Sequence, residues 1–306
     1  MKVILSRKGF DSKYGGCPSP IFSDGSMVSL PIPSPKGPTT YSEITVDGRN
    51  LGALVESLTS GKLKGSARAH FDPDLDSGAM KRLTGWLPAF GQTDGPRTHL
   101  DNCGVGVGDI FLFFGWYRRV DIDAQGKARL ADNSKNLHVI FGYLQVGEIL
   151  NVGSSVAATV ASKPWLASHP HLVGTWSEKN RIYVAAEQLI FPSLPALQTR
   201  SGGGVFGHIA ESRILTQPGQ GNRSLWRLPE TFAPNRGIAT LSCHQNPNRW
   251  LPSEMPGSVS LQSVSQGQEF VLNINDESIL DGWLSEIFFP KQAVNFENVL
   301  LSSGVI

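Results

Sequence analysis

One histidine and three aspartates fall within seven positions of the stretch GSARAHFDPDLDSGAMKR, residues 65–82. These four residues are His70, Asp72, Asp74 and Asp76. Residues i and i+2 of an extended segment point to the same side, so His70 and Asp72 would present an imidazole beside a carboxylate. That pair suits a divalent metal, which accepts nitrogen and oxygen ligands, and it also suits acid–base chemistry. We therefore expect His70 and Asp72 to act as catalytic residues and as metal ligands.

A second stretch, GPRTHLDNCG, repeats the same spacing with His99 and Asp101. We treat this pair as a second catalytic candidate. A distant histidine could complete a two-histidine, one-carboxylate site for iron. The candidates for that third ligand are His138, His208 and His244.

Turn and cap chemistry offers another explanation of the same residues. Asp72 could form an Asx-turn ahead of Pro73, and Asp74 or Asp76 could cap a helix that begins in LDSGAMKRL. His99 and Asp101 are followed by Asn102 and Gly104, which favour a turn. Both explanations stay open for both stretches.

A polar loop, SRKGFDSKYGG, follows the first apolar segment KVIL. Arg7 and Lys8 supply positive charge, and Ser12 with the glycine N–H groups could bind a phosphate. Asp11 is the catalytic candidate of this loop. The loop lacks the G-x-x-x-x-G-K-[ST] pattern of a P-loop, and an ordinary surface turn is the alternative.

Composition narrows the class of protein. The 306-residue chain has a net charge of +1 and only 17% charged residues, so no bulk attraction to nucleic acid or membrane is expected. Three widely spaced cysteines argue against a disulfide scaffold and favour a reducing, cytoplasmic compartment. The N-terminal apolar run is too short for a signal peptide, and no run of about 18 apolar residues predicts a membrane span.

The predicted elements are mostly strands. Residues 2–5, 108–123 and 137–150 read as strands, and the last two read as antiparallel neighbours. Residues 51–58 have helical periodicity, and DESILDGWLSEIFFP predicts a C-terminal helix capped by Asn275 or Asp276. The predicted class is α+β: a β-rich, mostly antiparallel sheet or partly closed barrel with few short helices and a C-terminal helix. We expect one domain over residues 1–306.

Aromatic residues cluster in sequence around the two His-x-Asp motifs. A base-stacking wall could be formed by Trp86, Phe90, Phe113, Phe114, Trp116 and Tyr117. Strand core is the better interpretation of Phe111 and Phe113.

Four segments together resemble a known family. They are MKVILSRKGFDSKYGGCPSPI, LPIPS, AHFDPDL and THLDNCGVGVGDIFLFFGWYR. They are similar to the nucleotide modification associated domain 3 family of bacteria and phages, and the likeness runs over nearly the whole chain. The resemblance implies a link to DNA base modification, because genes of this family occur near those of base modification systems. It also implies two polar features, an N-terminal aspartate and an HxD motif. Here these fall on Asp11 and on His70 with Asp72.

Residues 108–150 also resemble the strand pair of PUA-like domains, including the ASCH and EVE groups, which bind RNA or modified bases. A PUA-like subregion would span residues 105–190.

These observations favour an enzyme that acts on a nucleotide or on DNA, by hydrolysis or group transfer, with metal assistance. The alternatives are a non-catalytic, PUA-like reader of modified bases and an iron oxygenase. The sequence names no cofactor beyond a divalent metal, and it leaves the oligomeric state open.

Overall fold

The computed structural model describes residues 1–274 and 278–291 of the chain. Its helices are α1 (Leu51–Leu58), α2 (Asp94–Asn102), α3 (Val156–Ser162) and α4 (Ser278–Phe288). Its strands are β1 (Val3–Arg7), β2 (Ser19–Ile21), β3 (Thr39–Thr40), β4 (Thr45–Val46), β5 (Arg49–Asn50), β6 (Arg68–Ala69), β7 (Ala89–Gln92), β8 (Ile110–Ile122), β9 (Ala128–Leu130), β10 (Leu137–Asn151), β11 (Arg181–Ala185), β12 (Gly203–Val205), β13 (Leu225–Pro229), β14 (Ala239–Leu241), β15 (Trp250–Pro252), β16 (Ser258–Gln262) and β17 (Glu269–Ile274).

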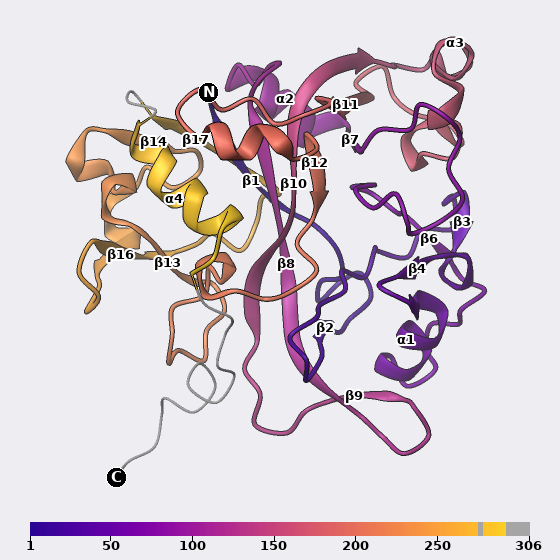
Figure 1. Ribbon diagram of the computed structural model, residues 1–306, viewed down its shortest axis with the longest axis horizontal. Helices are drawn as coiled ribbons and strands as arrows, with labels where there is room; N and C mark the ends of the chain where they lie inside the picture. Colours follow the sequence, from indigo (N-terminus) through magenta and orange to yellow (C-terminus); the bar gives the residue numbers. More distant parts are fainter. Residues whose placement is uncertain (275–277, 292–306) are drawn as a thin grey trace.

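A ten-stranded sheet organises the molecule, with the order β14-β17-β1-β8-β10-β11-β7 along its main path. The long strands β8 and β10 run through its centre (Figure 1). All pairs are antiparallel except β1–β8 and β2–β8, which are parallel. The two ends of the path, β14 and β7, do not pair with each other, so among the described residues the sheet stays open. Of the two predicted forms, the mostly antiparallel sheet is confirmed.

The core explains the continuous apolar runs of the central strands. Ile4 of β1 and Phe111, Phe113 and Ile140 of β8 and β10 are fully buried. An apolar residue at every position, rather than at alternate ones, fits a strand covered on both faces. Figure 1 shows the region of α1 and β3 to β6 on one side of β8 and β10, and β13, β16 and α4 on the other.

Local sequence signals account for two of the helices. Asn50 caps α1, because its Oδ1 accepts a hydrogen bond from the Ala53 N–H at 3.3 Å, and Leu51, Leu54 and Val55 are buried. Helix α4 buries Leu280, Leu284 and Ile287 against the core, as its periodicity predicts. The predicted caps Asn275 and Asp276 lie outside the described residues.

No helix in the part of the chain that the structure describes is long and apolar enough to cross a membrane.

Candidate functional site

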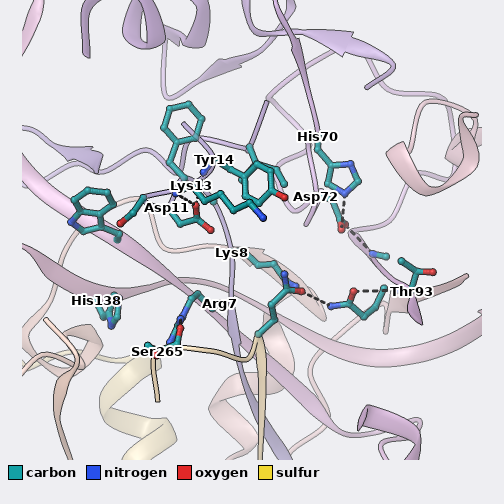
Figure 2. Close-up of a pocket in the computed structure, with 18 of the residues that line it drawn as sticks. Arg7, Lys8, Asp11, Lys13, Tyr14, His70, Asp72, Thr93, His138 and Ser265 are labelled. Carbon is teal, nitrogen blue, oxygen red and sulfur yellow. Dashed lines mark hydrogen bonds and ion pairs between the residues drawn. The ribbon is translucent and has the colours of Figure 1, made fainter. Parts of the chain in front are cut away.

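A pocket of about 540 Å³ opens where β1 ends. Arg7 closes that strand, and residues from Lys8 to Tyr14 form part of the wall. Asp11 lines the same pocket as His70 and Asp72, although about sixty residues separate them. Figure 2 shows Arg7, Asp11 and His138 toward one end and His70, Asp72 and Thr93 toward the other. Two loops that are far apart in the sequence therefore line one pocket.

The segment from His70 to Asp72 follows β6 and turns tightly, because the Asp72 N–H donates to the His70 carbonyl at 2.8 Å. The His70 N–H donates to the Ile32 carbonyl at 2.9 Å, directly after β6. His70 Nε2 and Asp72 Oδ2 lie 3.7 Å apart, on the same side of the segment. Strand β7 fixes the other carboxylate oxygen, because the Gly91 N–H donates to Asp72 Oδ1 at 2.9 Å.

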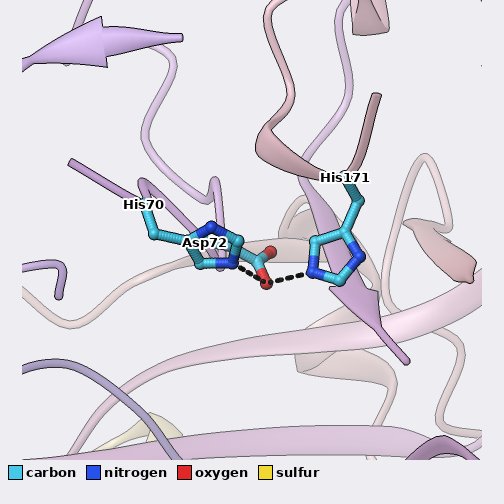
Figure 3. A group of neighbouring side chains, drawn as sticks. All are labelled: His70, Asp72 and His171. Carbon is cyan, nitrogen blue, oxygen red and sulfur yellow. Dashed lines mark ion pairs between the residues drawn. The ribbon is translucent and has the colours of Figure 1, made fainter. Parts of the chain in front are cut away.

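Two further histidines approach the same carboxylate from the connection between α3 and β11. His169 is the N-cap of a 3₁₀ turn over Pro170–Leu172, and His171 lies within that turn. His171 Nε2 lies 3.6 Å from Asp72 Oδ2, and His169 Nε2 lies 3.3 Å from Oδ1 without the alignment of a hydrogen bond. Figure 3 shows His70 and His171 converging on one oxygen of Asp72.

The hydrogen-bond network assigns the tautomer of His171. The Asn180 amide nitrogen donates to the His171 carbonyl at 2.8 Å, so the Asn180 oxygen accepts from His171 Nδ1–H at 2.7 Å. The proton of the neutral ring is therefore on Nδ1, and the lone pair of Nε2 faces Asp72. This is the arrangement of a metal-binding histidine oriented by an outer hydrogen bond.

Burial and packing keep His171 in place. Burial lowers its pKa to about 4, although the Asp72 carboxylate opposes the shift, so the ring is neutral at pH 7. The Trp176 ring stacks on it with centroids 4.2 Å apart. Gly91 also lies against the ring, since a Cβ atom at that position would fall 2.2 Å from His171 Cδ2. Glycine at position 91 therefore makes the room that the imidazole occupies.

Asp72 is a buried anion. Burial alone would raise its pKa, but the imidazoles of His169 and His70 outweigh that effect and hold the pKa well below its usual range. The carboxylate is 4% exposed, so its charge must be balanced by neighbours rather than by water.

His70, Asp72 and His171 together fit a metal ion. Their ligand atoms lie within 4.8 Å of one another. The separations of 3.6 and 3.7 Å between the imidazole nitrogens and Oδ2 are too long for hydrogen bonds. Bonds of about 2.1 Å to a tetrahedral ion would place ligand atoms about 3.4 Å apart, close to these values. Asn180, His169 and the Gly91 N–H would then be the outer groups that orient the ligands.

The model of the nucleotide modification associated domain 3 family matches residues 2–273. The chain belongs to this family. No curated protein and no solved structure matches it. The match takes in every residue that lines the pocket, from Arg7 to Gln268, and the family description associates the domain with nucleotide modification.

In this nucleotide modification associated domain, Asp11 both closes a turn and lines the pocket. Its Oδ1 accepts from the N–H groups of Lys13 at 2.7 Å and Tyr14 at 2.6 Å, so the turn interpretation accounts for one of its oxygens. Ser12 is exposed at the rim.

The two predicted phosphate-binding cations make contacts within the protein. Arg7 donates to the carbonyls of Ser265 at 2.8 Å and Val264 at 3.0 Å. Lys8 Nζ donates to Glu269 Oε1 at 2.8 Å, and Gln92 donates to the same oxygen at 2.7 Å. Both cations line the pocket, but much of their hydrogen-bonding capacity is already engaged.

The second motif of the domain is not extended, and the expectation that His99 and Asp101 lie side by side is wrong. Both are on α2, and side chains two positions apart on a helix are separated by about 200° around its axis, so they point to nearly opposite sides. His99 Nε2 contacts Ser242 Oγ at 3.0 Å, whereas Asp101 pairs with Arg97 at 3.0 Å and with Arg181. Neither lines the pocket.

The remaining aspartates of the first motif are structural. Asp74 makes two hydrogen bonds with the guanidinium of Arg82, and Asp76 Oδ1 accepts from the Gly78 N–H at 2.8 Å. Residues 75–83 contain a turn at 77–78 and a bend at 79–80 but no helix, so the predicted helix there is wrong. Asp72 caps no turn either, because its oxygen accepts from Gly91 of β7.

None of the three histidines predicted as a third ligand lies in the cluster of His70, Asp72 and His171. His138 is buried and accepts from Trp226 Nε1 at 2.9 Å, and His244 is buried against Ser242 and Val264. His208 lines a different pocket. The sequence does carry a signal for the two histidines that approach Asp72: the stretch SHPHLVGTW places His169 and His171 at the same i, i+2 spacing.

Only Trp116 of the predicted stacking wall lines the pocket. Phe90, Phe111 and Phe113 are buried in the core, and Trp86 lies under the guanidinium of Arg82.

Proposed function

We propose that the pocket is the active site of a metal-dependent enzyme that acts on a nucleotide or a nucleic-acid base, by hydrolysis or group transfer. The observation that supports it best is the convergence of His70, Asp72 and His171, a nitrogen and oxygen ligand set with an outer shell already in place. The family's association with nucleotide modification supports the substrate class. The volume of about 540 Å³ is within the range of small-molecule sites.

Charge supports an anionic substrate. The described residues that line the pocket include four cationic side chains, Arg7, Lys8, Lys13 and Arg223, against the two carboxylates Asp11 and Asp72. His70, Asp72 and His171 would hold a divalent cation, which would supply Lewis acidity to a carbonyl or phosphoryl oxygen of the substrate. Asp11 is the candidate proton acceptor, because its Oδ2 takes no hydrogen bond from a described residue.

The same ligand set favours a second candidate. Two histidines and one carboxylate are the ligands of non-haem iron oxygenases, and His171 supplies the histidine that the motif alone lacked. The two reactions are separated by loading the protein with Fe²⁺ and measuring oxygen uptake with nucleotides and DNA present. Metal-assisted hydrolysis or transfer consumes no oxygen. The non-catalytic reader predicts binding without turnover under either condition.

Metal binding is the first test. We expect a divalent ion such as Zn²⁺, Mn²⁺ or Fe²⁺ at 100 times its dissociation constant to raise the free energy of unfolding by about 2.7 kcal/mol. His171→Ala should abolish that stabilisation. His208→Ala removes an exposed histidine of another pocket and should keep it. Metal analysis of the purified protein and urea unfolding with and without the ion are the measurements. Equal stabilisation of the wild type and His171→Ala would refute the site.

Asn180 tests the outer shell. Asn180→Ala removes the acceptor that holds His171 Nδ1–H, so the ring is free to rotate. We expect metal affinity to fall about 10- to 100-fold while the ligands themselves remain. Competition with a fluorescent chelator measures the affinity, and an unchanged value would show that Trp176 and Gly91 alone fix the ring.

A further inference from the structure

Arg223 approaches the pocket from a part of the chain more than 200 residues after Asp11. Its backbone is fixed just ahead of β13. Thr216 Oγ1 donates to the Arg223 carbonyl at 3.0 Å and accepts from the His138 N–H at 2.8 Å. The backbone of the turn is closed by Gln217 N–H, which donates to the Leu225 carbonyl at 2.7 Å. Arg223 therefore lies in a turn that is anchored to β10 through Thr216.

The guanidinium of Arg223 lies over the indole of Trp116, with Cζ 4.3 Å from the ring centroid. Trp116 is itself held, because its Nε1–H donates to Asn136 Oδ1 at 2.7 Å. A guanidinium stacked on an aromatic face keeps its in-plane N–H groups available for an oxyanion. The one side-chain hydrogen bond of Arg223 among the described residues is a long one, 3.5 Å to Ser12 Oγ, and it forms no salt bridge with a described carboxylate.

This end of the pocket has more positive than negative charge. Arg7 and Arg223 are close enough that each is affected by Asp11, and burial together with Arg223 lowers the pKa of Arg7. Asp11 is one carboxylate for two guanidinium groups, and one of its oxygens already accepts two backbone N–H groups. Arg7 donates to two carbonyls, whereas Arg223 makes one long hydrogen bond to a described residue, so Arg223 has more N–H donors available.

We propose that Arg223, stacked on Trp116, binds the phosphate of a nucleotide whose sugar or base extends to His70, Asp72 and His171. The two ends of the pocket in Figure 2 then take the two ends of one molecule. The substrate class becomes a nucleoside monophosphate unit, and the phosphate is a handle rather than the reacting group. The placement of the sugar or base rests on the proposed function, whereas the phosphate subsite does not.

The test compares binding of the four deoxynucleoside 5′-monophosphates with binding of the four matching nucleosides, by calorimetry on the full chain. The protein is treated with a chelator first, so that the result does not depend on the metal. A charge-assisted hydrogen bond contributes about 1.5–3 kcal/mol, so we expect at least one monophosphate to bind about 10- to 100-fold more tightly than its nucleoside. Arg223→Gln should remove this preference.

Two further variants complete the test. Arg129→Gln removes an exposed surface arginine and should leave the preference unchanged. Arg223→Lys keeps the charge but loses the planar fork, so it should retain only part of the preference, and it serves if Arg223→Gln fails to fold. Equal binding of nucleotide and nucleoside by the wild type, no binding of any monophosphate, or full preference in Arg223→Gln would overturn the inference. The proposed function is tested separately, by the stabilisation that a bound metal gives, so its failure can be distinguished from failure of the phosphate subsite.

Discussion

Replacement of Lys8 by Met is expected to lower the free energy of unfolding by about 3 to 5 kcal/mol. Lys8 Nζ lies 2.8 Å from Glu269 Oε1, and the two side chains are 11% and 1% exposed. Without the ammonium group, the carboxylate would remain buried with only the amide of Gln92 beside it. Breaking one partner of a buried pair leaves an uncompensated charge, which costs far more than the pair itself contributes. Urea unfolding followed by circular dichroism measures the change.

Two variants separate this effect from general sensitivity of the loop. Lys13→Met makes the same chemical change at an exposed position of the same loop, and we expect it to stay within about 0.5 kcal/mol of the wild type. Glu269→Gln combined with Lys8→Met removes both charges and should recover most of the lost stability. A Lys8→Met protein as stable as Lys13→Met would mean that water reaches Glu269, contrary to its burial.

Much of the fold follows from local patterns in the sequence. The strands β1, β8 and β10, the antiparallel pairing of β8 with β10 and helix α1 come from apolar periodicity within single segments. Helix α2 does not, because DGPRTHLDN contains Gly95 and Pro96, which favour turns. Proline is tolerated in the first turn of a helix, and burial of Leu100 holds this one against the sheet. Tertiary packing here overrides a weak local preference. The expectation that His99 and Asp101 point to the same side assumed an extended segment, and it was wrong because both residues lie on a helix.

The candidate site, like the fold, has parts that local sequence predicts and parts that depend on the tertiary arrangement. The proximity of His70 and Asp72 is a local property of residues two positions apart, so the spacing predicted it, although the backbone between them turns tightly instead of being extended. The approach of His171, Trp176 and Arg223 depends on how β11 and β13 are placed relative to β1, and no spacing within one segment encodes that. Sequence also cannot tell which cations are already engaged. Arg7 and Lys8 read as free charges until the carbonyls of Ser265 and Val264 and the carboxylate of Glu269 are placed beside them.

The three neighbouring aspartates Asp72, Asp74 and Asp76 make different contacts, and this difference allows the proposed function to be tested. Asp74 is paired with Arg82 and Asp76 closes a turn, and neither lines the pocket. Asp72 alone is surrounded by imidazoles, and of these His171 directs an unprotonated nitrogen at it. Replacement of the carboxylate by an amide should therefore affect turnover very differently at positions 72 and 76.

Asp72→Asn is expected to reduce turnover on the order of 10³-fold, because metal-based charge stabilisation contributes several kcal/mol and each 1.36 kcal/mol is a factor of ten. The amide keeps the volume and can still accept from the Gly91 N–H, but it removes the only anionic ligand of the set. Asp76→Asn is the matched control, since an amide oxygen can still accept from the Gly78 N–H, and it should retain activity within a few-fold. Initial rates on the nucleotide or DNA that the wild type converts, measured with saturating metal, give the comparison. Equal losses at both positions would assign the effect to the loop's folding, and no loss at position 72 would remove the carboxylate from the chemistry.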